Sequence, residues 1–266
     1  MFGRKCSIVA VVHVLPLPGS AGYRGSIADI LTVALEEARV YKEEGVDAIL
    51  VENMHDVPYL KGRVEPETTA AMAVIARAVK SECALPTGVQ VLAGANLEAL
   101  GVAVAAELDF IRVEGFVYAH VGDEGMHESC AGELLRRRAS LQSRHVSVFA
   151  DVKKKHAAHA ITADVGLVET ARTAEFFGAD AIVVTGDSTG HPPEVDHVRG
   201  VRAAVTNRVV VGSGITPENI HAFSSHCDAV IVGSAFKHGG VWKNQVDGER
   251  VRKVVQALDY AKSEAL

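Results

Sequence analysis

Short apolar runs rich in Val and Ile alternate with longer amphipathic stretches along the whole chain. The apolar runs predict β-strands at residues 7–13, 47–52, 87–92, 109–114, 146–151, 180–185, 209–213 and 228–233. Helical patterns follow them in turn, at residues 26–45, 66–82, 96–107, 131–142, 164–178, 193–205, 216–225 and 247–266. Eight strands and eight helices in strict alternation predict an α/β fold, a (β/α)8 TIM barrel. An open doubly wound sheet is the alternative, and the regular eightfold alternation favours the barrel.

A faint internal repeat and the helix ends support this interpretation. An aspartate stands just before the second, fourth, sixth and eighth apolar runs, at Asp47, Asp109, Asp180 and Asp228. Gly45 and Gly178 stand where helices should end. No linker or low-complexity segment interrupts the pattern, so we expect one TIM-barrel domain over residues 1–266.

Composition and charge limit the classes of partner. The chain is 48% hydrophobic and 23% charged, which suffices for a large core. With 27 basic and 33 acidic residues its net charge is −6, so we expect neither nucleic acid nor an anionic membrane as a partner. No apolar run reaches the roughly 18–20 residues that a membrane helix needs, so membrane insertion is not expected either.

The cysteines and the first residues bear on the compartment. The four cysteines form no Cys-x-x-Cys pair and are typical of buried thiols in a reducing, cytoplasmic setting. The opening stretch MFGRKCSIVAVVH resembles a signal peptide, but His13 interrupts its apolar run and no clear cleavage site follows. We therefore interpret it as the first strand.

The barrel interpretation places the functional site at the carboxyl ends of the strands. Alternation of side chains along each strand directs a charged group inward at several of these ends. The candidate catalytic residues chosen in this way are Lys153, Asp151, Glu52, Glu114 and His13, with Arg112 as a neighbour. Lys153 would act as a base, a Schiff-base nucleophile or an electrostatic stabiliser, and Lys154 would be solvated. The alternative is a purely structural ion-pair network across the mouth.

Two glycine turns predict a phosphate site. The seventh strand ends in VGSGIT and the eighth in VGSAF, and glycine lets main-chain N–H groups approach an anion closely. The candidate phosphate- and substrate-binding residues are Gly212, Ser213, Gly214, Gly233 and Ser234, joined by Asp187, Asn53 and Lys155. The alternative is that both turns merely close the barrel.

Metal and nucleotide motifs are mostly absent from the sequence. The His-x-His of many barrel metallohydrolases is missing, and no third ligand accompanies His156 and His159, so a zinc site is not expected. A hard cation such as Mg²⁺, held by Glu52, Glu114 or Asp151, stays open as a cofactor. There is no Walker P-loop and no G-x-G-x-x-G that opens a Rossmann unit.

Seven segments resemble the BtpA/SgcQ family over nearly the whole chain. They are VVHVLPLPGS, GVDAILVENMHDVPY, FIRVEGFVYAHVGDEG, FADVKKKHAAH, VTGDSTGHPP, VGSGITPENI and VIVGSAFK. The resemblance implies a TIM barrel of the phosphate-binding type. It also implies a link to photosystem I biogenesis, the process from which the cyanobacterial member is named, and some bacterial members are labelled nucleoside triphosphatases.

Together these features predict an enzyme that acts on a phosphorylated small metabolite, a sugar phosphate or a nucleotide. Lyase, isomerase and glycosyl-bond chemistry all remain open. The alternatives are a non-catalytic assembly or maturation factor, as the photosystem name suggests, and a barrel that binds a small molecule without turnover. Because barrels frequently associate, a homo-oligomer is a further expectation.

Overall fold

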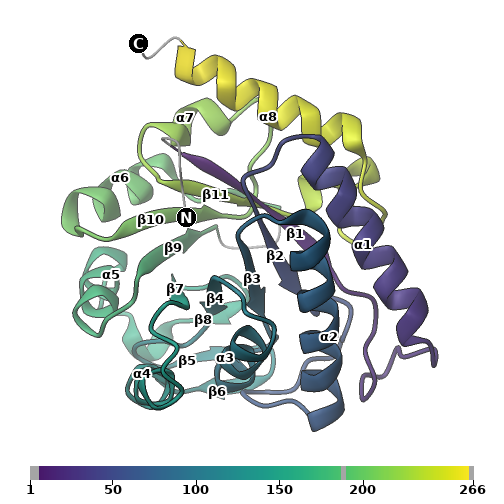
Figure 1. Cartoon of the computed structure of the whole chain (residues 1–266). Coiled ribbons are helices and arrows are strands. Elements are labelled where there is room, and N and C mark those ends of the chain that lie inside the picture. Colours follow the sequence, from purple (N-terminus) through teal and green to yellow (C-terminus); the bar gives the residue numbers. More distant parts are fainter. Residues whose placement is uncertain (1–5, 187–189, 264–266) are drawn as a thin grey trace.

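Eight parallel strands close into a barrel in the computed structural model, which describes residues 6–186 and 190–263 (Figure 1). Around the barrel the order is β1-β2-β3-β4-β7-β9-β10-β11, and β11 pairs with β1. The strands are β1 (Ser7–His13), β2 (Ala48–Glu52), β3 (Thr87–Gln90), β4 (Phe110–Val113), β7 (Ser147–Val152), β9 (Ala181–Thr185), β10 (Arg208–Gly212) and β11 (Ala229–Val232). The predicted barrel is thus confirmed, and Ser7–His13 of the signal-like opening stretch form its first strand.

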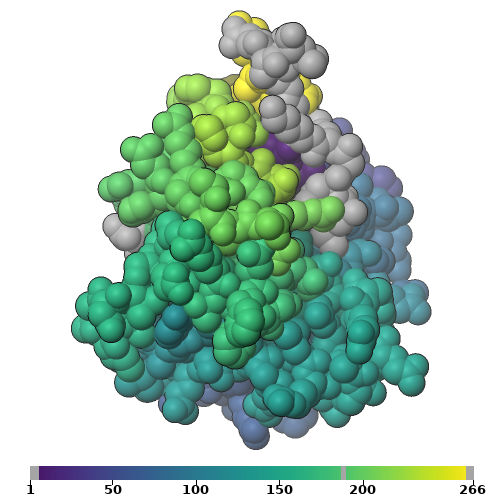
Figure 2. All heavy atoms as spheres, turned by 90° about the vertical axis from the view of Figure 1, so that its left-hand side faces the viewer, coloured from purple at the N-terminus to yellow at the C-terminus, as the bar shows by residue number. Residues whose placement is uncertain are grey.

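Helices surround the strands, one after each barrel strand. They are α1 (Ile27–Glu43), α2 (Pro66–Cys83), α3 (Asn96–Ala105), α4 (Ala131–Ser140), α5 (Leu167–Phe176), α6 (Val195–Ala204), α7 (Ile220–Ser224) and α8 (Gly248–Ser263). Figure 2 shows one side of this layer, where the teal and green middle of the chain forms most of the surface. No helix of the described residues is long and apolar enough to cross a membrane.

The apolar core has two layers because the strand side chains alternate between two faces. The outer layer packs strands against helices, and the inner layer fills the barrel with side chains such as Val9, Leu50 and Ile231. Phe110 and Phe149 stack inside with ring centroids 4.6 Å apart. Glycine is required at position 88, because a Cβ there would lie 2.3 Å from the Phe110 ring.

The repeated aspartates tie neighbouring strands together at the amino-terminal end of the barrel. The carboxylates of Asp47, Asp109, Asp180 and Asp228 accept main-chain N–H groups of the preceding barrel strand at 2.7–2.8 Å. Each aspartate N–H in turn donates to a carbonyl of that same strand. The fourfold repeat therefore has a structural role, on the face opposite the predicted site.

A small antiparallel sheet that the sequence does not predict lies in the loops after β4 and β7. Its strands are β5 (His120–Gly122), β6 (Gly125–His127) and β8 (Ala157–Ala158), with β5 in the middle. The described part of the chain also has three short 3₁₀ turns, η1 (Ala160–Thr162), η2 (Ser234–Phe236) and η3 (His238–Gly240). Strands of two or three residues carry too little periodicity to be seen in a sequence.

Candidate functional site

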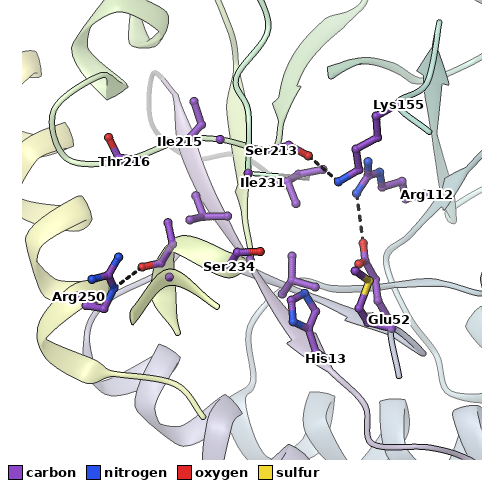
Figure 3. A pocket seen from close by; sticks show the side chains of 18 residues that line it. His13, Glu52, Arg112, Lys155, Ser213, Ile215, Thr216, Ile231, Ser234 and Arg250 are labelled. Carbon is purple, nitrogen blue, oxygen red and sulfur yellow. Dashed lines mark hydrogen bonds and ion pairs between the residues drawn. The ribbon is translucent and has the colours of Figure 1, made fainter. Parts of the chain in front are cut away.

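A cavity of about 200 Å³ opens at the carboxyl end of the barrel. His13, Glu52 and Arg112 line it from the ends of β1, β2 and β4, and Lys155 from the loop after β7 (Figure 3). The turns after β10 and β11 form the opposite part of the wall. The cavity therefore lies where parallel strands of a barrel deliver their functional side chains.

Arg112 is the centre of a buried charge cluster. Its guanidinium donates to both carboxylate oxygens of Asp151, each at 2.9 Å, and to Glu52 Oε1 at 3.1 Å. Burial acts to lower the pKa of Arg112, but the charges of Asp151 and Glu52 outweigh it and raise that pKa. Burial raises the pKa of Glu52 despite the neighbouring Arg112. Glu52, Arg112 and Asp151 point into the barrel, as the strand alternation predicts.

Lys155 extends from the loop after β7 toward the glycine turn after β10. Its Nζ donates to Ser213 Oγ at 2.8 Å. Burial and the nearby Arg112 lower the pKa of Lys155, while Glu52 and Asp151 act to raise it. A lysine held in this way lies closer to its neutral form than a solvated lysine and is better able to accept a proton.

The turn after β10 is held in an uncommon backbone conformation. Ser213 and Gly214 have φ values of +74° and +69°. The Asn219 side chain fixes the turn, donating to Gly214 O at 2.8 Å and accepting from Thr216 N at 2.9 Å. A positive φ at a residue other than glycine is costly and concentrates at functional sites.

The turn after β11 completes the wall. Gly233 and Ser234 line the cavity, and a Cβ at position 233 would lie 3.0 Å from His13 Nε2. Arg250 of α8 lies beyond Ser234, on the side opposite Lys155 and Arg112 in Figure 3, and its Nε donates to Ala235 O at 2.7 Å. The cavity is therefore flanked by cationic side chains on two sides.

His13 forms part of the floor and keeps to its neutral form. Burial, and next the charge of Lys237, lower its pKa to about 3. Its Nδ1 lies 3.1 Å from Trp242 O, and the two rings lie 6.3 Å apart, edge to face. A neutral imidazole here can hydrogen-bond a ligand without adding positive charge.

The predicted directions of Lys153 and Lys154 are wrong. The strand alternation ends at Val152, because Lys153 takes a positive φ of +48°. Its Nζ consequently donates to the Thr162 carbonyl at 2.8 Å, away from the cavity. Lys154 is buried instead of solvated, and its Nζ lies 3.1 Å from Glu114 Oε2. The lysine at the cavity is Lys155.

Four other predicted residues, Asp151, Glu114, Gly212 and Asn53, do not line this cavity. Asp151 binds Arg112, which does line it. Glu114 lines a neighbouring cavity, and Gly212 is buried beneath the turn that follows it. Asn53 is buried and binds main chain, accepting from Leu92 N at 2.7 Å, so the structure gives it a scaffold role where a ligand contact was predicted. Asp187 lies outside the described residues.

Some lining residues escape prediction from sequence. Arg250 and Thr216 line the cavity from or beside helices. Next to His13, the rings of Trp242 and His55 lie 4.8 Å apart at an angle of 56°. No strand-end pattern marks these positions. A basic residue in the first turn of a helix, where acids are favoured, is the one signal that could have marked Arg250.

The described residues contain no group of three His, Cys, Asp or Glu side chains arranged to hold a metal ion. The carboxylates considered for Mg²⁺ face cations of the protein: Glu52 and Asp151 bind Arg112, and Glu114 binds Lys154. A divalent cation stays a prediction.

Comparison with known proteins gives a family and a fold. The sequence profile of the BtpA family matches residues 4–260. A Caenorhabditis elegans protein, named as mitochondrial, is 43% identical over 260 residues, covering 96% of this chain and 94% of its own. The Photosystem I biogenesis protein BtpA of Synechocystis is 35% identical over 252 residues, covering 94% of this chain and 87% of its own.

Solved structures with the same fold are distant in sequence. Thiamine phosphate pyrophosphorylase from Pyrococcus furiosus superposes with a TM-score of 0.61 at 14% identity, covering 97% of both chains. A (S)-3-O-geranylgeranylglyceryl phosphate synthase from Thermoplasma acidophilum, solved with sn-glycerol-1-phosphate, has a TM-score of 0.58 at 16% identity. The match covers 97% of this chain and 94% of the synthase chain. At these identities the likeness concerns the fold alone.

Proposed function

The chain belongs to the BtpA family, and from that premise we propose that it is an enzyme acting on a phosphorylated small molecule. One observation carries the proposal: a single cavity has two glycine turns on one wall and a lysine, an arginine and a glutamate on the other. The names of the structural neighbours, which include a thiamine phosphate and a glycerol phosphate enzyme, agree with a barrel used for phosphate compounds.

The phosphate group would occupy the space between the two turns. Ser213–Gly214 and Gly233–Ser234 line the cavity, and their main-chain N–H groups would be the donors, because glycine lets an oxyanion approach them closely. The guanidinium of Arg250 would add positive charge from the far side. This arrangement requires no P-loop.

Lys155 and Glu52 would perform the chemistry. Burial shifts their pKa values toward each other, lowering that of Lys155 and raising that of Glu52. Both line the cavity, so the amine and the carboxyl can face one substrate. The pair fits an isomerase or lyase step in which Lys155 takes a proton from carbon and Glu52 gives one to a carbonyl oxygen.

The test separates binding from chemistry. Candidate sugar phosphates are incubated with the protein and followed by NMR, while calorimetry measures binding of inorganic phosphate and ribose 5-phosphate. Lys155→Met should lower turnover at least ~10³-fold and change phosphate affinity far less, because it removes the proton acceptor. Lys153→Met is the matched control and should retain turnover, since Lys153 binds the Thr162 carbonyl. Failure of both phosphates to bind contradicts the proposal.

A second function follows from the name of one relative. The Synechocystis relative is named a photosystem I biogenesis protein, which suggests a non-catalytic assembly factor. A stable protein partner that is retained by Lys155→Met and by Gly214→Ala would favour this function, because a partner surface does not need the cavity.

The proposed compartment is the cytoplasm. All four cysteines are free thiols, with Cys6 and Cys227 Sγ atoms 3.7 Å apart and unbonded, which suits a reducing setting. The mitochondrial name of the Caenorhabditis elegans relative belongs to that protein. Association into a homo-oligomer stays a prediction.

A further inference from the structure

A second cavity of about 260 Å³ adjoins the first at the mouth of the barrel. The two share four lining residues, Glu52, Met54, Arg112 and Lys155. Resting on the proposed function, we propose that this second cavity binds a planar ring bearing an amino group, carried on the same molecule as the phosphate. The substrate class is then a phosphate ester of an aminated ring, and the mononucleotides AMP and CMP are members of it.

One part of the lining of the second cavity favours a flat ring. Met54, Tyr59, Leu92 and Trp242 supply this aromatic and aliphatic part of the wall. Tyr59 is fixed, since its hydroxyl donates to Met54 O at 2.8 Å. Rings stack on aromatic and apolar side chains of this kind, and the rest of the wall is polar or charged.

The polar groups of this cavity favour a ligand edge that donates hydrogen bonds. The turn between β5 and β6 brings Asp123 and Glu124 to its wall. The two other acids there form ion pairs within the protein, Glu114 with Lys154 and Glu52 with Arg112, each at 3.1 Å. Glu124 Oε2 lies 3.2 Å from His127 Nε2, so Asp123 and the other oxygen of Glu124 are the acceptors that the turn offers to a ligand. An exocyclic amino group can donate to them and a carbonyl oxygen cannot.

The two cavities differ in charge at the parts that they do not share. The first has Arg250 there, whereas the second has Asp123 and Glu124 beside Lys154 and His156. A molecule that is anionic at one end and rich in N–H groups at the other would bind in one orientation only. In that orientation the bonds between phosphate and ring lie beside the four shared residues, where Lys155 and Glu52 stand.

Trp242 provides a direct reporter, because it is the sole tryptophan of the chain and lines the second cavity. Inorganic phosphate, ribose 5-phosphate, AMP, CMP and UMP are titrated into the full chain. Calorimetry gives each affinity, and fluorescence reports ring stacking. AMP and CMP should quench Trp242 and bind about tenfold or more tighter than ribose 5-phosphate. UMP carries a carbonyl in place of the amino group, so its affinity should exceed that of ribose 5-phosphate by a smaller factor.

A charge-matched pair of variants tests the acidic turn. Asp123→Asn with Glu124→Gln should weaken AMP binding at least about threefold and leave ribose 5-phosphate binding unreduced. Glu36→Gln with Glu43→Gln removes the same charge from exposed positions on α1 and should change neither affinity. Binding of AMP and CMP no tighter than ribose 5-phosphate, without quenching, overturns this inference alone. No binding of inorganic phosphate or ribose 5-phosphate overturns the proposed function and this inference with it.

Discussion

Arg112 shows at the scale of one residue how the site is assembled. Its side chain points inward from β4 and joins carboxylates from β2 and β7, strands that are not neighbours of each other in the barrel. Three buried charges are tolerated because the guanidinium fork satisfies both oxygens of Asp151 and one of Glu52. Such a cluster fixes the position of Glu52, which the proposed chemistry uses.

Arg112→Met should destabilise the protein strongly. It leaves Glu52 and Asp151 buried without their cation, which typically costs about 3–5 kcal/mol of the free energy of unfolding. Denaturant titration measures the loss. Arg172→Met is the control, since Arg172 is exposed and lies 3.9 Å from Glu169, and it should cost about 0.5 kcal/mol or less. If the two variants lost equal free energy of unfolding, the buried cluster of Arg112, Glu52 and Asp151 would contribute no more to stability than an exposed ion pair.

Gly214→Ala should impair both stability and phosphate binding. The new Cβ would lie 2.0 Å from Pro192 N, so the turn after β10 must move and its N–H groups with it. The expected cost is about 1–3 kcal/mol, with weaker phosphate binding by calorimetry. Gly25→Ala separates the cost of a positive φ from the cost of a steric clash. Gly25 also has a positive φ, +86°, but nothing lies within 4 Å of the position of an alanine Cβ there. If Gly25→Ala costs as much, the clash is not the cause.

At the scale of elements, the hydrophobic periodicity predicted the barrel strands and their inward faces, and it failed at the end of β7. Every barrel strand was located within two residues at either end, and the inward parity of β1, β2 and β4 was right, because long buried strands enforce strict alternation. The failure came at Lys153, where a positive φ turns the chain. A lysine is not a residue type that marks such a turn in a sequence.

The site outside the strand ends was harder to predict for a related reason. The hairpin that carries Asp123 and Glu124 consists of strands of three residues each, and Trp242 lies in an irregular segment before α8. Their positions depend on contacts between segments far apart in the chain, such as Trp242 O with His13. Local pattern contains no information about those contacts.

The aspartate repeat leads to a prediction about residues that stabilise the barrel without contributing to ligand binding. Asp109→Ala removes the acceptor for Thr87 N and the partner of Lys80, and should lower the free energy of unfolding by about 1–2 kcal/mol. Lys80→Met should cost less, about 1 kcal/mol at most, since the pair is partly exposed. Denaturant titration measures both. Ribose 5-phosphate affinity should be unchanged, and a weakened affinity would contradict the separation of the two faces.

On the scale of the whole molecule, stability and chemistry occupy opposite ends of the barrel. The aspartate ties lie at the amino-terminal end, and the cation cluster, the glycine turns and the hairpin lie at the carboxyl end. The carboxyl end also holds three histidines whose pKa values are lowered, His13 to about 3 and His55 and His120 to about 4, with burial as the main cause. Folding therefore keeps these side chains neutral where water would let them charge.

Acid should weaken the folded state through these histidines. Their folded pKa lies below the ordinary value of 6.5, so between about pH 6.5 and pH 4 the unfolded chain binds more protons than the native one. Their contribution is complete above pH 6.5 and is lost as the pH falls through this window. Buried Glu52 and Glu37, with raised pKa values, act in the opposite direction, so the histidine term must be isolated by mutation.

His13→Gln isolates that term, because glutamine has no proton to gain in this range. Denaturant titrations at about pH 7.5, 6, 5 and 4 give the free energy of unfolding of the protein and the variant. The fall with acid should be shallower in the variant, by up to about 1.4 kcal/mol per pH unit between pH 6 and pH 4. His145→Gln, at an exposed position, should leave the slope as it is. If both variants keep the original slope, His13 takes up its proton in the folded protein, and the floor of the cavity is then cationic in mild acid instead of neutral.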